Sequence, residues 1–495
     1  MTNFLEKSMN MTLTENGAVT YESTGSDCLD LFATVGGLRN AREEEVVKRF
    51  IRAYAEDPDT AMKLLFYARD VRGGLGERRV FRIIFGWMAK HHPESVRKNL
   101  EYVAEFGRYD DLLVLFGTPC EEEMTGCLRK RFEADLAALA EGRSVSLLGK
   151  WLPSVNASNR ETVKNARKLA KAFGLSEAEY RKKLTALRAR IRILENNLRE
   201  KDYSFDYSAQ PSRAMFKYQK AFIRNDGERY REFLSRVSKG EAKLHADHVA
   251  PYELVEPYLK GYTFAGVTGL KAMTPEEKQA LNATWESLPD FGGRENALAV
   301  IDTSGSMYMT DHPMPAAVAL SLGLYFAERN QGAFRNQFIE FSQKPQLITV
   351  KGETFVDRLE YVSSLCEVAN TNLEAVFDAV LLAAVANDVK QEEMPAKLII
   401  ISDMEFDFCV EGASSTNFEA AKKKYQRYGY RLPEVIFWNV QSRNRQQPVR
   451  QNEQGVALVS GATPRLFEMI AGGNLSPYRF MMEILGGERY EKISA

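Results

Sequence analysis

Five oxygen-bearing side chains occur at three polar loops in the carboxyl-terminal part of the chain. The segment ALAVIDTSGSM places Asp302, Ser304 and Ser306 at alternating positions of one tight loop. Thr371 stands just ahead of a long apolar helical segment, and Asp403 follows the hydrophobic run KLIIIS directly. Carboxylate and hydroxyl oxygens are hard ligands that suit Mg²⁺ better than zinc. We therefore predict a divalent-cation site, with Mg²⁺ expected and Mn²⁺ or Ca²⁺ as alternatives.

The elements that position these loops are short apolar runs alternating with helical segments after about residue 290. Such alternation predicts βαβ units around a mostly parallel sheet, so we expect a doubly wound α/β domain over 291–495. In open α/β sheets, ligands bind beyond the carboxyl ends of the strands. A plainer interpretation is that D-x-S-G-S is a polar turn capping the next helix. Glu405 and Asp407 are acceptors behind the site or, more simply, solvated loop carboxylates.

The five side chains also resemble a known pattern. Asp302, Ser304 and Ser306 match the D-x-S-x-S of the metal-ion-dependent adhesion site in von Willebrand A domains, and Thr371 and Asp403 match its second and third loops. The resemblance implies that the serines and the threonine contact the metal and that the aspartates act partly through water. It also implies that an acidic group of a protein partner completes the coordination shell.

The region before about residue 290 has a different hydrophobic pattern. From about 28 to 240 the chain is a succession of amphipathic helices, for example EEEVVKRFIRAYAED and RVFRIIFGWMAKHH. Strand-like alternation is nearly absent, so we predict an α-helical, HEAT-like repeat region over 28–290, preceded by a flexible segment over 1–27. The loop RGGLGE (72–77) lacks the Lys-Ser/Thr of a phosphate-binding P-loop, and a glycine turn between two helices explains it better.

The helical segments LFYARDVRGGLGERRVFRIIFGWM and EFGRYDDLLVLFG, together with the carboxyl-terminal domain, resemble the Ro/TROVE proteins. The chain looks still closer to an uncharacterised Ro-like family that carries YRKKLTALR and PSRAMFKYQKAFIRND. This resemblance implies a helical-repeat scaffold that binds small structured or misfolded RNA, followed by a von Willebrand A domain.

A basic middle segment agrees with an RNA partner. Residues 151–250 contain 22 Lys and Arg against 12 Asp and Glu, although the whole chain has a net charge of −1. Phosphate contacts from such side chains give affinity without sequence specificity. Tyr207, Phe216, Tyr218 and Phe222 lie among them as candidates for stacking on bases, although helical aromatics are usually core. The predicted RNA-binding residues are Lys164, Arg167, Lys168, Lys171, Lys182, Lys183, Arg188, Arg192, Arg213 and Lys217.

Composition and motifs also limit the cellular location and the classes of function that we expect. The five cysteines lack C-x-x-C pairs, and the chain shows neither a signal peptide nor a membrane-spanning stretch, so we expect a cytoplasmic protein that is a monomer. No nucleophile lies beside a base, and a single hydroxyl-rich site lacks the two-metal clamp of phosphoryl transfer, so we expect no enzyme. The alternative function is a metal-dependent protein–protein adaptor that binds no RNA.

Overall fold

The computed structural model describes residues 10–191, 193–260, 269–291, 296–308, 312–341, 344–365, 372–407, 416–470 and 475–495. The chain forms two compact units. The sheet unit comprises residues 1–42 and 207–487, and the helical unit comprises residues 43–206 and 488–495. This division differs from the expected boundary near 290, because residues 207–290 pack with the sheet unit.

The sheet unit is built on six strands in the order β5-β4-β3-β6-β7-β8. Four successive pairings, β4 with β3 and onward to β8, are parallel, and only the edge strand β5 runs antiparallel. The predicted doubly wound α/β fold is therefore confirmed. The strands are β3 (Ala297–Asp302), β4 (Gln337–Phe341), β5 (Gln346–Thr349), β6 (Lys397–Ser402), β7 (Glu434–Asn439) and β8 (Val456–Ser460).

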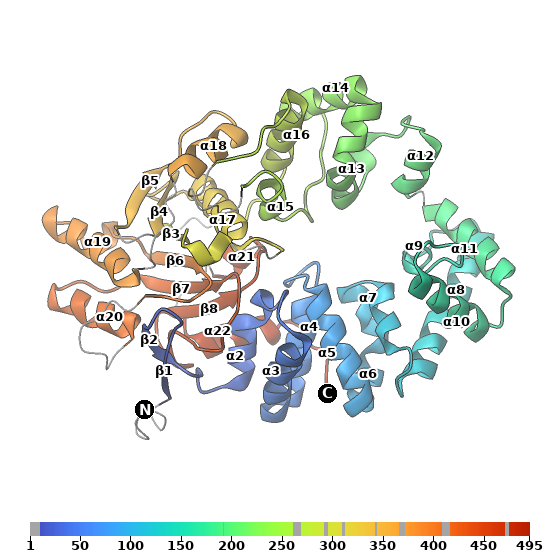
Figure 1. Ribbon diagram of the computed structural model, residues 1–495, viewed down its shortest axis with the longest axis horizontal. Coiled ribbons are helices and arrows are strands. Elements are labelled where there is room, and N and C mark those ends of the chain that lie inside the picture. The colour runs from blue at the N-terminus through green and yellow to red at the C-terminus, as the bar shows by residue number, and fades with distance from the viewer. Residues whose placement is uncertain are drawn as a thin grey trace. The chain divides into compact units, whose positions relative to one another are not determined.

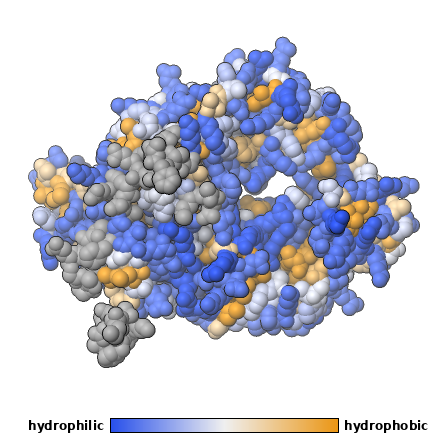
Figure 2. Space-filling view, in the orientation of Figure 1, coloured by the Kyte–Doolittle hydropathy of each residue, from blue (hydrophilic) through white to orange (hydrophobic). Residues whose placement is uncertain are grey.

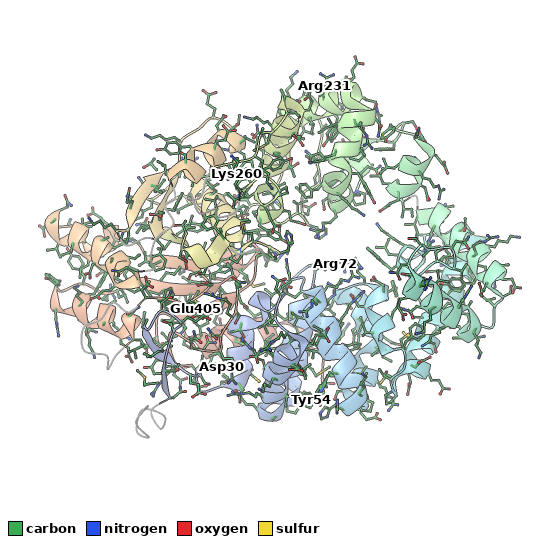
Figure 3. All side chains as sticks on the ribbon, viewed as in Figure 1. Asp30, Tyr54, Arg72, Arg231, Lys260 and Glu405 are labelled. Carbon is green, nitrogen blue, oxygen red and sulfur yellow. The ribbon has the colours of Figure 1, made fainter. Side chains whose placement is uncertain are left out.

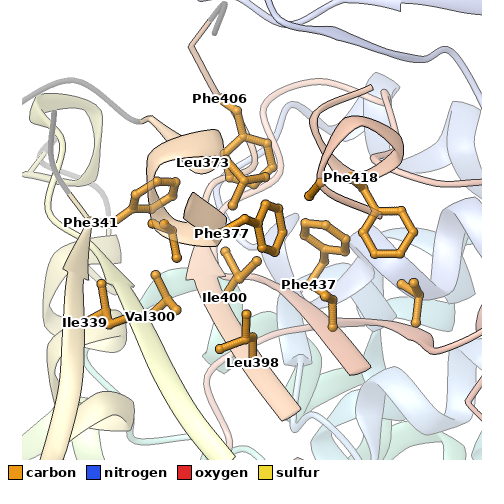
Figure 4. Close-up of a cluster of buried hydrophobic side chains, with 14 of the residues drawn as sticks. Val300, Ile339, Phe341, Leu373, Phe377, Leu398, Ile400, Phe406, Phe418 and Phe437 are labelled. Atoms are coloured by element: carbon orange, nitrogen blue, oxygen red, sulfur yellow. The ribbon is translucent and has the colours of Figure 1, made fainter. Parts of the chain in front are cut away.

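Helices cover both faces of this sheet, which explains why β3 and β6 are apolar between their end residues. On one face, α19 (Leu373–Ala386) and α20 (Asn417–Arg427) pack on the strands, with Phe377 and Phe418 in the core (Figures 1 and 4). On the other face, α17 (Pro315–Arg329) lies so close to β3 that a Cβ at Gly323 would stand 1.9 Å from Ile301. Only glycine permits this approach of helix to sheet.

The chain before the sheet also belongs to this unit. Residues 1–27 are not structureless where they are described, because β1 (Met11–Leu13) and β2 (Val19–Tyr21) form an antiparallel hairpin. The remaining helices of the unit are α2 (Asp27–Thr34), η1 (Val35–Gly37), η4 (Tyr207–Ala209), α13 (Ser212–Asn225), α14 (Gly227–Ser238), α15 (Pro251–Val255), α16 (Pro275–Glu286), η5 (Gly305–Tyr308), α18 (Phe355–Leu365), η6 (Gln391–Glu393), α21 (Leu466–Ile470) and α22 (Pro477–Leu485).

Among its described residues the helical unit has helices and no strands, and many neighbouring helices contact one another, for example α3 with α4, α4 with α5 and α10 with α11 (Figure 1). This confirms the helical prediction for the amino-terminal region. The helices are α3 (Glu43–Glu56), α4 (Pro58–Arg69), α5 (Arg78–His91), α6 (Pro93–Asn99), η2 (Leu100–Tyr102), α7 (Val103–Phe106), η3 (Tyr109–Leu115), α8 (Glu121–Ala140), α9 (Leu148–Trp151), α10 (Arg160–Ala172), α11 (Glu177–Ile191), α12 (Leu194–Glu200) and η7 (Glu488–Tyr490).

A buried ion pair joins three elements of the helical unit. Asp111 is fully buried and accepts hydrogen bonds from Arg69 Nε and Arg82 Nε, each at 2.7 Å, and from the backbone of Arg108 at 2.9 Å. The glycine loop between α4 and α5 is a turn, as expected, and a Cβ at Gly74 would collide with the carbonyl oxygen of Tyr67. Together these contacts fix α4 and α5 against η3.

Polar side chains dominate the visible surface, and apolar ones gather in small patches (Figure 2). One such patch lies over α19, where Leu382 and Val385 are exposed. Within the described ranges, no helix is both long and apolar enough to cross a membrane.

The buried ion pair generates a stability prediction. Asp111→Ala leaves Arg69 buried without its carboxylate, so we expect the free energy of unfolding to fall by about 3–5 kcal/mol. Urea denaturation measures this. Glu133→Ala is the control, because its partner Arg129 is about half exposed and such surface pairs contribute under ~1 kcal/mol. If the two variants lost equal free energy of unfolding, the buried ion pair of Asp111 would not be a major contribution to stability.

Candidate functional site

The strand order reverses between β3 and β6, and the two predicted metal loops that the structure describes, those of Asp302 and Asp403, follow these two strands. From β3 the next strand along the chain, β4, lies on one side, while β6 lies on the other. Asp302 is the last residue of β3 and Asp403 follows the last residue of β6. Because parallel strands end at the same edge, the two carboxylates come into each other's electric field. This is the position at which open α/β sheets bind ligands.

Asp302 is the most deeply buried group of the site, with no exposed surface. Its Oδ2 accepts a hydrogen bond from Ser402 Oγ at 2.6 Å, and its Oδ1 accepts one from the backbone N–H of Ser304 at 2.9 Å. Burial, and then the negative charge of Asp403, raise the pKa of Asp302 to about 7, although these hydrogen bonds act in the opposite direction. A nearby cation would relieve both effects.

The two serines of the loop also converge. Ser304 Oγ and Ser306 Oγ are 3.1 Å apart, and Ser304 is buried. The loop does not cap α17, which begins only at Pro315 and whose N-cap residue, Met314, makes no side-chain cap; the helical turn that follows the loop directly is η5. Thr371 lies outside the described residues. Among the residues that are described, no group of three or more His, Cys, Asp or Glu side chains could hold a metal, so any ion here would depend on hydroxyl ligands.

Asp403 has a partner that the sequence did not indicate. Its side chain is 1% exposed, and its Oδ2 accepts a hydrogen bond from a terminal nitrogen of Arg443 at 2.8 Å. The other oxygen accepts the backbone N–H of Glu405 at 3.2 Å. Arg443 lies in the loop after β7, forty residues away in the chain, and no spacing rule connects it with Asp403. Asp403 thus carries a positive neighbour that the adhesion-site pattern does not include.

Glu405 is not the solvated loop carboxylate that the simpler interpretation predicted. It is 2% exposed, and its carboxylate accepts hydrogen bonds from the backbone of Glu15 and from the side chains of Asn444 and Gln446, at 2.8–2.9 Å. Burial raises its pKa, and these donors partly offset that effect. Glu405 (labelled in Figure 3) therefore ties the β1–β2 hairpin and the loop after β7 to the loop that carries Asp403.

The predicted basic residues on α10 form one surface. Lys164, Arg167, Lys168 and Lys171, together with Arg160, which was not among the predicted residues, share a face of the helix. Ala166 and Leu169 are buried on the other face. With the loop before the helix they line an open concavity of about 580 Å³. Among the residues that the structure describes, exposed acids pair with two of the five, Glu161 with Lys164 at 3.8 Å and Glu177 with Arg167 at 3.0 Å. The face carries a surplus of positive charge.

The predicted residues of α11 divide between surface and interior. Lys182 is exposed and Lys183 is half-buried. Arg188 is a structural residue, because it donates to the carbonyl oxygens of Gly149 and Leu152 at 2.9 and 2.7 Å at the two ends of α9. Burial lowers its pKa. Its role as an RNA contact stays a prediction, and Arg192 lies outside the described residues.

Arg213 and Lys217 lie on α13 in the sheet unit, not in the unit that holds the other predicted contacts. Arg213 forms an ion pair with Glu253, and Lys217 lies 4.8 Å from the ring centre of Tyr218. The stacking prediction is wrong for Tyr207 and Phe222, which are buried in one aromatic cluster with Tyr230 and Phe233. Phe216 and Tyr218 are half-buried.

Two protein-family models match this chain. A family model described as "Domain of unknown function (DUF2828)" matches residues 14–130 and 158–290, more than half of the chain. The chain belongs to the DUF2828 family. In this DUF2828 protein a second model, described as "Domain of unknown function (DUF7788)", matches residues 296–476, the segment that contains the sheet and both candidate aspartates.

Two further proteins are similar to this DUF2828 protein. An uncharacterized protein of Acanthamoeba polyphaga mimivirus is 27% identical over 518 residues, which cover 96% of this chain and 87% of that protein. Among solved structures, the crystal structure of the Deinococcus radiodurans RO (RSR) protein is matched over 93% of each chain, with 14% identity and a TM-score of 0.39.

The position of Glu405 in the DUF2828 protein generates a prediction. Glu405→Gln replaces one acceptor oxygen by a donor amide that faces other donors, so the hairpin contact should weaken by about 1–3 kcal/mol. We expect backbone amides of residues 14–21 to exchange with solvent at least about tenfold faster, as measured by hydrogen–deuterium exchange mass spectrometry. The exposed Glu392→Gln is the control. Unchanged exchange in Glu405→Gln would show that the carboxylate does not hold the hairpin.

Proposed function

We propose that this protein is a Ro-like RNA-binding scaffold that binds small structured or misfolded RNA through the basic face of α10, and that it acts by binding and not by catalysis. The observation that supports this is the arrangement of five cations on one helical face with two exposed acidic partners. Phosphate groups are the ligands that such a face attracts, and their contacts require no sequence-specific geometry. Lys168 lies 4.6 Å from the ring centre of Phe116, so it is held in place over an aromatic ring.

A second part of the proposal concerns the sheet unit. We propose that the edge formed by Asp302, Ser304, Ser306 and Asp403, with Thr371, binds Mg²⁺ or a similar divalent cation and recruits an acidic protein partner. Support comes from two buried carboxylates in each other's field and two converging hydroxyls, a set of hard oxygen donors. The ion would supply positive charge at the sheet edge. The chain's own residues orient the donors, with Ser402 and the Ser304 amide holding Asp302.

RNA binding is tested by charge reversal. We expect Lys164→Glu, Arg167→Glu and Lys171→Glu together to lower the affinity for an RNA hairpin with a single-stranded tail by at least about tenfold at low salt, and to reduce the slope of log K against log salt by about three. Fluorescence anisotropy measures both. A control variant reverses the exposed Lys90, Arg129 and Lys130 and so makes the same change in net charge.

If both charge-reversal variants lost equal RNA affinity, RNA would be attracted non-specifically by the charge of the whole protein and not by the α10 face. If neither the unmodified protein nor either variant retains RNA from cells, the adaptor function becomes the better explanation.

Metal binding is tested by the thermal shift that Mg²⁺ produces. A ligand that binds only the native state raises its stability, by about 2.7 kcal/mol at a hundredfold excess over Kd. We expect a rise in Tm with Mg²⁺ in the unmodified protein and none in Asp302→Asn or Ser304→Ala. Because Asp302→Asn also removes a buried charge, the comparison is between shifts and not between melting temperatures. Glu392→Ala is the control, and no shift in the unmodified protein would reject the metal site.

A further inference from the structure

Arg443 connects the candidate metal edge with the amino-terminal hairpin. One terminal nitrogen donates to Asp403 Oδ2 at 2.8 Å, and the other lies 3.1 Å from Glu15 Oε2. Glu15 stands in the turn between β1 and β2, and this turn is itself bound to the loop after β6 by Thr14 and Asn16, which donate to the carbonyl oxygens of Phe406 and Glu405 at 2.6 and 2.7 Å. The guanidinium is thus shared by two carboxylates.

The two carboxylates differ in their environment. The Asp403 side chain is 1% exposed, whereas that of Glu15 is 46% exposed and that of Arg443 is 25% exposed. Arg443 Nε is buried and makes no hydrogen bond to any part of the chain that the structure describes. A guanidinium has five N–H donors, and one left unbonded in the interior costs free energy. Arg443 therefore has one unsatisfied donor while its terminal nitrogens contact Asp403 and Glu15. Of these two carboxylates, that of Glu15 is the more exposed.

We propose that Arg443 is a built-in competitor for the divalent cation at Asp403, and that Glu15 is the partner that retains Arg443 when the cation binds. The inference rests on the metal site proposed above and states how the chain regulates it. Two positive charges at one buried carboxylate repel each other strongly, because Coulomb energies are large where water is excluded. Occupancy of the site is thereby coupled to the β1–β2 hairpin, and the coupling is reciprocal.

The change in charge at each substituted residue determines whether the Mg²⁺ affinity should rise or fall. Arg443→Met removes the competing charge and keeps a side chain of similar length, so Mg²⁺ should bind more tightly, by about tenfold. Arg443→Lys keeps the charge, so its affinity should stay within about twofold of the unmodified protein. Glu15→Gln removes the alternative partner, which makes Arg443 costlier to displace, and should weaken Mg²⁺ binding by about threefold.

The experiment is a double-mutant cycle read by isothermal titration of the full-length protein with MgCl₂. If Glu15 acts only through Arg443, then Glu15→Gln in the Arg443→Met background changes the Mg²⁺ affinity no further. A second measurement follows hydrogen exchange of the amides of residues 14–21. Mg²⁺ should slow their exchange in the unmodified protein, because Arg443 then pairs fully with Glu15, and should leave it unchanged in Arg443→Met.

The outcomes separate this inference from the metal site itself. Equal Mg²⁺ affinity in the unmodified protein and Arg443→Met overturns the competition while leaving the metal site intact. A further loss in the double variant relative to Arg443→Met overturns the role of Glu15, since its charge would then act directly on the ion. Binding by Arg443→Met alone supports competition in its strongest form. Absence of binding in both proteins rejects the metal site and the inference together.

Discussion

Two carboxylates of like charge lie next to each other at the carboxyl edge of a buried parallel sheet, and the surroundings of Asp302 and Asp403 follow from that constraint. Burial and mutual repulsion both favour the uncharged form of Asp302, as its raised pKa records. Four donors from three segments bind the two carboxylates. They are the Ser402 hydroxyl at the end of β6 and the Glu405 amide just after it, the Ser304 amide after β3, and the guanidinium of Arg443 after β7. Each donor offsets part of the electrostatic cost, and a divalent cation would offset more.

The chain uses its other positive charges in two ways that differ in burial. Arg69 and Arg188 are turned inward, the first to the carboxylate of Asp111 and the second to backbone carbonyls at α9. Both hold helices together. On α10 the cations face outward over a packed apolar side, and their acidic neighbours are exposed and few. The same residue types therefore hold helices together in one place and form an exposed basic surface in another.

The sequence predicted the fold class and the convergence of Asp302, Ser304, Ser306 and Asp403 because both follow from local rules. Apolar runs alternating with helices indicate a parallel sheet, and strand ends of such a sheet meet at one edge. It failed where contacts join distant segments. Glu405 was interpreted as a solvated carboxylate, since nothing nearby in the chain shows that Glu15, Asn444 and Gln446 donate to it. Tyr207 and Phe222 were candidates for base stacking, yet they form core.

By itself, then, the sequence determined the periodicities that make helices and strands, the order of those elements, and the oxygen-bearing side chains at the strand ends. Tertiary structure alone decided which charges are paired. Helical periodicity distinguishes an inner from an outer face, but it cannot tell whether an arginine near the boundary reaches a carbonyl, a carboxylate or solvent, because its long side chain spans several ångströms in any direction. In the folded protein, Arg443 pairs with Asp403 and Glu15, and no local sequence pattern links it with either residue.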